Sequence, residues 1–596
     1  MDDVTNQLEK MSKDDLAALA KAVVSVLGNG KTQKQSLKLR TPVRGLLIDE
    51  EIDDYIAGYQ SVGLPLSSIQ TAAEEMMGEI IKRLDASNSS LPKEKKIALP
   101  TRLPASALAK YLVASGNVAM LMLGDEQYTL AIRPETGRNA EAWEIIYNAV
   151  RERNTLREQI EKANPEANRP YLEDVIRKVE NMAPLRVPTK KGYLIACENG
   201  VVDVRTKTLI PYEQCRDLTF VYKIPVKYNP QATNPIIYNA EDGTYWDVET
   251  WMSEVGVIPE ITALLWQVIA ACVRPYAKWD QCVFLYGTEG NNGKGTLLTL
   301  LRALCGEWNT MSMEVNKFDD RFALQDLPKK TLIITDENPD GAHVDGTSNF
   351  KACVTNDPYY TDVKYSAPIT AKWNGVMVQC INSLFTCDSK SRSFLRRFLP
   401  VPLNACFTGL ERKYIKHDYV KRPEVLEYVL KKVVDMGFFE TFYNPPACEE
   451  LRKQFKWYND DLAFFMEDME NEFQWNMLPY DFLYDLYISY KYGDSKPVKA
   501  ITQTKFTQRI KEWAKESKVW MVPTQEKMTP SNRMDRPEPL ILEYNLKRWL
   551  NPLYRGEDWA RRCCPPLKVA YRCLVRRSDY ISKDANYTGN AQDTNS

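Results

Sequence analysis

Residues 283–298 read VFLYGTEGNNGKGTLL, which is an apolar run, a turn rich in glycine and asparagine, and the start of a helical pattern. Backbone N–H groups in such a turn can point toward phosphate oxygens, and the first turn of the helix adds positive partial charge. Lys294 can then reach the terminal phosphates of a nucleotide. The stretch predicts a strand, a phosphate-binding loop and a helix, and therefore an α/β fold that binds ATP. An ordinary loop between a strand and a helix is the structural alternative.

Two features of this loop depart from the usual phosphate-loop pattern. Six residues separate Gly287 from Lys294, where the pattern has five, and Gly295 stands where Ser or Thr normally follows the lysine. Thr296, one position later, is therefore the residue that we expect to hold Mg²⁺. The residues expected to surround the nucleotide are Gly287, Gly290, Asn292, Gly293, Lys294, Gly295 and Thr296.

Two further apolar runs end in polar residues. Residues 331–337, TLIITDE, end in Asp336 and Glu337, and residues 375–382 end in Asn382. At the end of a strand, Asp336 would hold Mg²⁺ through water and Glu337 would polarise the attacking water. Asn382 would then sense the γ-phosphate. A strand followed by an acidic turn, without chemistry, is the structural alternative for the first run.

Two adjacent arginines, Arg396 and Arg397, precede a last apolar run at residues 398–403. An arginine that one subunit delivers to the next can stabilise charge on a transferring phosphoryl group. This role requires a ring of subunits, and the sequence does not decide which of the two arginines would perform it. Two arginines on a solvated helix face are the alternative.

Residues 351–372 combine basic and aromatic side chains around an Asn-Asp-Pro turn. Lysines contact phosphates without reading the base sequence, and a tyrosine can stack on a base. We therefore expect Lys351, Lys364, Tyr365 and Lys372 to contact single-stranded nucleic acid. The alternative is a surface hairpin without a ligand.

The order of these motifs resembles that of superfamily three helicases, and most closely that of the phage and poxvirus primase-helicase group. The resemblance implies an AAA+ type ATPase that uses ATP and Mg²⁺, forms a hexameric ring and moves along one DNA strand from 3′ to 5′. It places Lys294, Asp336, Glu337 and Asn382 in the ATP site and Lys364 on a hairpin in the pore. Single-stranded and forked DNA would be the substrates. Primase, polymerase and single-strand-binding protein are possible partners in phage DNA replication.

The resemblance and the patterning together suggest a domain order. We expect an N-terminal helix (12–30) and a linker (31–40) within residues 1–40, a helical segment at 41–100 with a boundary at 86–90, an α+β collar domain at 101–240 with a hairpin at 193–203, the ATPase domain at 241–440, a C-terminal winged-helix-like module at 441–575 and a disordered tail at 576–596. Apolar faces at 482–490 and 506–513 predict two helices in the C-terminal module. A plain helical lid is the alternative there.

The composition restricts the function further. Lys and Arg number 78 against 79 Asp and Glu, so any grip on DNA must come from local patches. The 13 cysteines form no Cys-x-x-Cys pair, which indicates reduced core residues. No apolar run is long enough to span a bilayer, and the first residues lack a signal-peptide pattern. We expect a cytoplasmic protein, which would act in the host cytoplasm if it comes from a phage.

Histidine is nearly absent, with only His343 and His417. This excludes a Ser-His-Asp triad and a histidine-rich zinc site. Primase domains joined to related motors use a catalytic histidine or clustered cysteines, so a helicase without priming activity is expected rather than a fused primase-helicase. An ATP-gated replication initiator that binds origins without processive unwinding, an accessory ring with weak ATPase, and an RNA substrate are also compatible with these residues.

Overall fold

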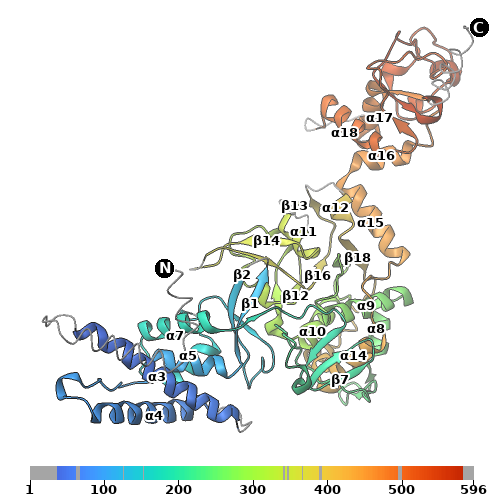
Figure 1. Ribbon diagram of the computed structural model, residues 1–596. Coiled ribbons are helices and arrows are strands. Elements are labelled where there is room, and N and C mark those ends of the chain that lie inside the picture. The colour runs from blue at the N-terminus through green and yellow to red at the C-terminus, as the bar shows by residue number, and fades with distance from the viewer. Residues whose placement is uncertain are drawn as a thin grey trace, which may run out of the picture. The chain divides into compact units, whose positions relative to one another are not determined.

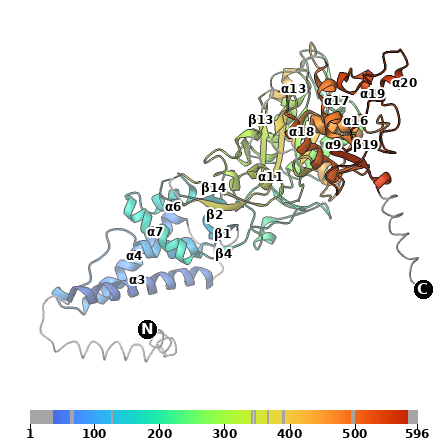
Figure 2. The same ribbon diagram turned by 90° about the horizontal axis from the view of Figure 1, so that it is seen from above.

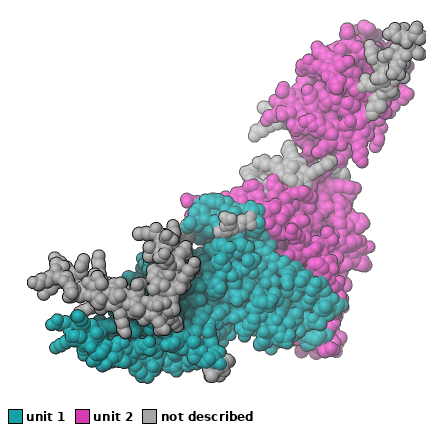
Figure 3. Space-filling model, in the orientation of Figure 1, with its two compact units in different colours: residues 1–230, 324–331, 358–374 teal, residues 231–323, 332–357, 375–596 magenta. Residues whose placement is uncertain are grey.

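The computed structural model describes residues 36–580 except 62–67, 125–126, 152, 340–342, 345–347, 365–366, 388–391 and 494–499. It is a mixed α/β structure with two compact units, shown in Figure 3. Unit 1 comprises residues 1–230, 324–331 and 358–374, and unit 2 comprises 231–323, 332–357 and 375–596. The helix expected at 12–30 and the tail from 581 onward lie outside the described residues.

The helices of unit 1 share one core. They are α3 (Ser36–Ser61), α4 (Ile69–Ser89), α5 (Ala105–Ala114), α6 (Thr155–Ala163) and α7 (Arg169–Met182), and Figure 2 shows α3 beside α4. Residues 36–40, expected in a linker, already belong to α3. The expected boundary at 86–90 is also largely helical, because Asn88 is buried and bonds both the N–H and the C=O of Ile97 at 2.6 and 2.8 Å.

Unit 1 also contains three groups of strands. One sheet has the order β3-β2-β1-β4, from β1 (Val118–Gly124), β2 (Gln127–Ile132), β3 (Glu144–Ile146) and β4 (Leu185–Arg186). The second, β5 (Leu194–Cys197), β6 (Gly200–Asp203) and β7 (Thr208–Ile210), contains the hairpin predicted at 193–203. The third is a hairpin of β14 (Pro358–Thr361) and β15 (Ile369–Lys372) that packs on β1: a Cβ at Gly124 would lie 2.6 Å from the carbonyl oxygen of Thr370.

The main sheet of unit 2 is parallel throughout and buried. Its strands are β10 (Cys282–Tyr286), β11 (Thr310–Ser312), β12 (Leu332–Thr335), β16 (Val376–Ile381) and β18 (Phe398–Pro402), in the order β11-β12-β16-β10-β18. The four strands predicted around the motifs are all present. In a parallel sheet the carboxyl ends lie along one edge, which is where ligands bind in open α/β folds. The order places β16 between β10 and β12.

Four helices of unit 2 pack against one another near this sheet, as Figure 1 shows. They are α8 (Val248–Gly256), α9 (Pro259–Cys272), α10 (Lys294–Cys305) and α14 (Pro423–Asp435). Shorter elements of unit 2 are β8 (Ile237–Tyr238), β9 (Tyr245–Trp246), α11 (Ser348–Val354), β13 (His343–Val344), β17 (Thr386–Cys387), α12 (Arg392–Leu395) and α13 (Lys413–His417). No single helix in the described part of the chain has the length and apolarity to cross a bilayer. Only α8 and α9 taken together, bent by 119° at their junction, meet that criterion.

The C-terminal residues of unit 2 form their own hydrophobic core. Helix α15 (Pro446–Asn459) packs on β18 of the main sheet. The elements around the C-terminal core are α16 (Asp461–Met469), β19 (Met477–Pro479), α17 (Tyr480–Tyr492), α18 (Gln503–Glu516), β20 (Trp520–Met521), α19 (Leu540–Glu543), α20 (Trp559–Arg562) and β21 (Cys573–Arg576). The two predicted apolar faces lie on α17 and α18 and are largely buried. Residues 577–580, expected in the tail, are helical, because Asp579 pairs with Arg533 and Tyr580 packs on this core.

Candidate nucleotide-binding site

The loop after β10 is shaped by contacts within itself. A Cβ at Gly287 would lie 2.1 Å from Nδ2 of Asn292, and this buried amide donates to the carbonyl oxygen of Glu289 at 2.9 Å. Gly293 precedes α10 with φ of 86°, and a Cβ there would lie 2.9 Å from Cγ2 of Val255. Both glycines are therefore required for close approach, and Gly293 also for its left-handed backbone.

Three of the predicted catalytic residues are linked by hydrogen bonds. Nζ of Lys294 donates to the carbonyl oxygen of Gly287 at 2.8 Å and to Oδ1 of Asn382 at 2.7 Å. Nδ2 of Asn382 donates to Oε1 of Glu337 at 2.8 Å. Because β16 lies between β10 and β12, Asn382 stands between the lysine and the carboxylate. The structure thus brings together residues that are 88 and 45 positions apart in the chain.

Asp336 lies beside this group but has a different partner. Its side chain is 66% exposed, and Oδ2 is 3.2 Å from Nη2 of Arg302 on α10. The motifs gave no reason to select Arg302. Its only signal is its place on α10, about two turns after Lys294. Asp336 and Glu337 line an open hollow of about 540 Å³ together with residues 311–314.

The two predicted metal ligands do not share a hollow. Thr296 lines a second one, of about 580 Å³, between the phosphate loop and residues 407–417, whereas Asp336 lines the first. Within the described residues, no three His, Cys, Asp or Glu side chains are grouped as a metal site. The oxygen atoms of Asp336 and Glu337 still fit Mg²⁺, which commonly uses one or two carboxylates together with waters and substrate phosphates.

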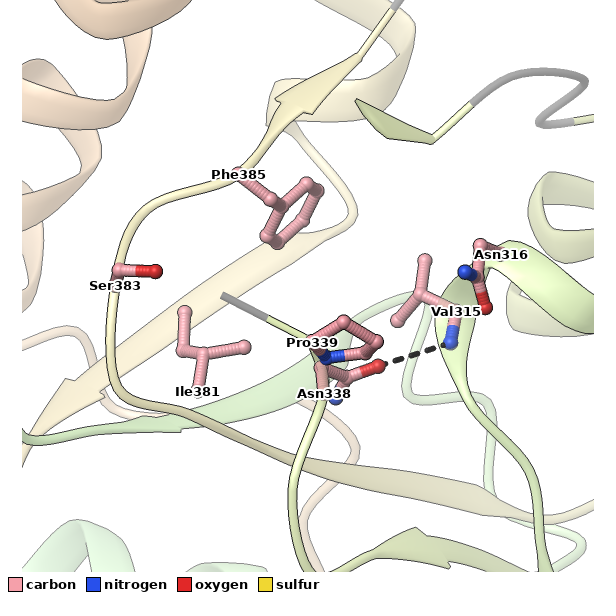
Figure 4. A pocket seen from close by; sticks show the side chains of 7 residues that line it. All are labelled: Val315, Asn316, Asn338, Pro339, Ile381, Ser383 and Phe385. Carbon is pink, nitrogen blue, oxygen red and sulfur yellow. Dashed lines mark hydrogen bonds between the residues drawn. The ribbon is translucent and has the colours of Figure 1, made fainter. Parts of the chain in front are cut away.

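Asn338, which follows the acidic pair, is a second residue that the motifs did not single out. It is buried, accepts from the N–H of Val315 at 3.1 Å and donates to Oε1 of Gln379 and the carbonyl oxygen of Cys380. Figure 4 shows it at a small hollow of about 10 Å³, room for about one water molecule. These bonds fix the chain leaving β12 to β16, and they thereby position Glu337.

The two arginines before β18 have different environments. Arg397 is buried, and Nη2 donates to Oγ1 of Thr355 at 3.2 Å. Burial, with a contribution from the charge of Arg396, lowers the pKa of Arg397. Arg396 is exposed. Only Arg396 is therefore presented for contact with another molecule.

The residues expected to contact nucleic acid occupy two elements. Lys364 is exposed in the turn between β14 and β15, and Lys372 is half-buried at the end of β15. Lys351 is half-buried on α11. Tyr365 lies outside the described residues. Lys364 is thus the described candidate with the most open position.

Comparison with known families gives matches in the sequence before and after the strands of the main sheet. Residues 68–256 match the family described as "D5 N terminal like", and residues 458–537 match "Poxvirus D5 protein-like". Over these two stretches the chain is similar to D5 proteins. The resemblance to the phage and poxvirus primase-helicase group is therefore confirmed. Residues 285–397, which hold the predicted phosphate loop and the acidic pair, match a family of unknown function, DUF5906.

Solved structures with similar folds include two A-form apo structures of the NrS-1 C-terminal region. One is 11% identical with a TM-score of 0.40 and covers 78% of this chain and 98% of that chain. The other is 12% identical with a TM-score of 0.37 and covers 61% and 78%, respectively. No curated protein matches the sequence.

Proposed function

We propose that this chain is an ATP-dependent DNA helicase of phage or mobile-element replication, with an AAA+ type motor in unit 2. The observation that carries the proposal is the hydrogen-bonded series Lys294, Asn382 and Glu337 at the carboxyl ends of β10, β16 and β12. A cation for phosphate, an amide and a carboxylate at one sheet edge are the groups that phosphoryl transfer to water requires.

Each side chain has a distinct chemical role in this proposal. Lys294 offsets negative charge on the β- and γ-phosphates, and Glu337 accepts a hydrogen bond from the attacking water and orients it. Asn382 connects the two, so that phosphate contact at Lys294 and the position of Glu337 are coupled. Asp336 would hold Mg²⁺, which supplies charge neutralisation to the phosphates when bound, whereas Thr296, the other predicted ligand, lines the second hollow.

A ring of subunits completes the proposed site. We assign the transferred arginine to Arg396, because Arg397 is buried against Thr355 while Arg396 is exposed. In a hexamer Arg396 would contact the nucleotide of the neighbouring subunit, and Lys364 would grip the phosphates of the threaded strand. Movement from 3′ to 5′ and action in the host cytoplasm with replisome partners belong to the same proposal.

The C-terminal core supports a winged-helix module that contacts forked DNA. The chain order is α16, β19, α17, α18, β20, α19, α20, β21, and the three strands pair as β19-β21-β20. Helix α18 buries Phe506 and Ile510 and exposes three lysines together with two glutamates, namely Lys505, Lys511, Lys515, Glu512 and Glu516. In helix-turn-helix proteins the second helix enters the major groove. The exposed lysines of α18 also favour a second candidate, an ATP-gated initiator that binds duplex DNA without processive unwinding.

Hydrolysis and unwinding separate these candidates. The purified chain is tested beside Lys294→Ala for ATP hydrolysis and for unwinding of forked DNA with a 3′ or a 5′ single-stranded tail. Lys421→Ala is the matched control, because Lys421 is an exposed lysine that lines neither hollow. The helicase proposal expects DNA-stimulated hydrolysis and unwinding that requires the 3′ tail, both lost only in Lys294→Ala. Tight duplex binding without unwinding would refute it and support the initiator.

Priming is tested in the same preparation. RNA or DNA primer synthesis on a single-stranded template should be absent at all nucleotide concentrations, since residues 1–340 contain no histidine. Template-dependent synthesis by the pure chain would contradict this and support a fused primase-helicase.

A further inference from the structure

Gly295 leaves a space that a lysine from a distant segment fills. A Cβ built on Gly295 would lie 3.1 Å from Nζ of Lys416 and 3.9 Å from its Cε; among the described residues, no other heavy atom outside its chain neighbours and helix backbone lies within 4 Å. Lys416 belongs to α13, more than 100 residues later in the chain. Where a phosphate loop usually carries a Ser or Thr side chain, this site has an ammonium group.

The segment that carries Lys416 is attached to the phosphate loop. The N–H of Leu403 donates to the carbonyl oxygen of Tyr286 at 2.7 Å, and the N–H of Phe407 donates to that of Asn291 at 2.9 Å. Asn291 also donates through Nδ2 to Oε1 of Glu411 at 2.8 Å. The backbone that leads into α13 is therefore positioned by the loop, and the approach of Lys416 to Gly295 follows from that.

The same segment is anchored on its other side. The hydroxyl of Tyr414 donates to Oδ2 of Asp242 at 2.5 Å, and its ring packs against Tyr419 with centroids 4.9 Å apart. Tyr414 and Lys416 are two positions apart on α13. The anchored tyrosine therefore limits rotation of the short helix that presents the lysine.

Cationic side chains outnumber carboxylates in the lining of the hollow beside Lys416: Arg412, Lys413 and Lys416 stand against Glu254 and Glu411. Nζ lies beside the first turn of α10, where the helix dipole contributes positive partial charge, and Lys294 begins the same turn. Among the residues that the structure describes, Lys416 has no carboxylate within ion-pair distance. Glu411, which lines the same hollow, already accepts from Asn291 and from the N–H of Gly409. Two ammonium groups at one helix start favour an anionic ligand.

The hollow beside Lys416 also has an apolar side. Trp251, Phe407 and Ile415 line it together with Gly293 and Thr296 of the phosphate loop. Its volume of about 580 Å³ lies in the range of small-molecule sites. A ligand with a phosphate chain and a flat apolar group fits this lining better than free phosphate does.

From these contacts we infer that Lys416 is a second phosphate-binding residue of the nucleotide site and acts within the same subunit as Lys294. This inference rests on the proposed function. Gly295 leaves room for the ammonium group, because a side chain at this position would crowd Nζ, which lies 3.1 Å from the position of a Cβ. The glycine at position 295 and Lys416 of α13 therefore belong to the same arrangement. The loop lacks the usual hydroxyl side chain at this position, and the ammonium group of Lys416 lies there instead.

Calorimetric titration of the full chain with ATP, ADP, AMP and adenosine tests this inference. Lys416→Gln should weaken ATP binding roughly tenfold or more, since a hydrogen bond to a charged group is worth about 1.5–3 kcal/mol. The loss should shrink as phosphates are removed and vanish for adenosine. Lys421→Gln, an exposed lysine outside the hollow, should bind like the wild type. Far-UV circular dichroism confirms that each variant is folded.

Gly295→Ser provides an independent test. The new side chain should displace the ammonium group and weaken ATP binding, and it should add little further loss in the Lys416→Gln background, so the two changes are non-additive. Wild-type affinity in Lys416→Gln, with binding lost in Lys294→Ala, would overturn the inference and leave the proposed site intact. Absence of nucleotide binding by the wild type would overturn both.

Discussion

Asn382→Ala is the change that best tests whether Asn382 couples Lys294 to Glu337 or only helps to bind ATP in the proposed site. The substitution removes the bond at 2.7 Å from Lys294 and the bond at 2.8 Å to Glu337. Lys294 keeps its bond to the carbonyl oxygen of Gly287 at 2.8 Å. The lysine therefore stays in the loop, whereas Glu337 loses the donor that holds it toward β16.

The size of the effect follows from these bonds. A hydrogen bond to a charged group contributes about 1.5–3 kcal/mol, and partial exposure of this site favours the lower end. Loss of both bonds corresponds to about 3 kcal/mol, which is roughly a hundredfold in rate at about 1.4 kcal/mol per tenfold. Because Lys294 is retained by Gly287, the Kd for ATP should change by less than about fivefold.

The measurement is single-turnover ATP hydrolysis beside equilibrium ATP binding, each with and without single-stranded DNA. Asn382→Asp serves as the companion variant, since it keeps an acceptor for Lys294 but places a second carboxylate beside Glu337. It should bind ATP and still hydrolyse it poorly. If Asn382→Ala hydrolyses ATP within threefold of the wild type, or if binding falls as much as hydrolysis, the coupling role is wrong. An unchanged melting temperature would show that the fold is intact.

Three other predictions follow from single contacts. Arg302→Ala should lower the Mg²⁺ concentration for half-maximal hydrolysis two- to fivefold, because a partly exposed pair worth about 0.5–1 kcal/mol no longer competes for Asp336; an unchanged Mg²⁺ titration would contradict this. Rings of Arg396→Ala alone or of Lys294→Ala alone should not hydrolyse ATP. Rings that mix the two variants should regain hydrolysis at interfaces where one subunit supplies Lys294 and its neighbour supplies Arg396. Arg397→Ala should chiefly lower the melting temperature, because Arg397 is buried. Glu538 is fully buried, and burial raises its pKa to about 7 from 4.5, so its contribution to stability is present below about pH 4.5 and is lost as the pH rises through about 7. The loss is at most about 3 kcal/mol. Urea unfolding between pH 5 and 8 should show this fall, and Glu538→Gln should flatten it.

The strands that carry the motifs could be predicted from the sequence alone. Apolar runs that end in polar residues mark β10, β12 and β16, because a buried parallel strand is continuously apolar and its carboxyl end meets solvent. That rule also placed Lys294, Glu337 and Asn382 at one edge. The order of the strands was not available from the pattern, and it is this order that puts Asn382 between the other two.

Residues that act through long-range contacts left no local signal. Arg302, Asn338 and Lys416 belong to no motif, and their importance depends on partners 23 to 121 positions away, namely Asp336, Val315 and Gly295. Asn88 illustrates the same limit for the fold: a Ser-Asn-rich segment is typical of a linker, yet a buried amide that satisfies both backbone groups of Ile97 makes it the end of a helix.

The extra residue in the phosphate loop has a structural cause that bears on nucleotide binding. The side chain of Asn292 fills the space beside Gly287 and donates to the carbonyl oxygen of Glu289, so a side chain of the longer loop itself holds the loop in place. Lys294 is likewise already held by Gly287 and Asn382. Incoming phosphate must therefore compete for a lysine that has partners. Phosphate that takes Lys294 would free Oδ1 of Asn382, whereas Nδ2 keeps its bond to Glu337 and so keeps the carboxylate oriented for the attacking water.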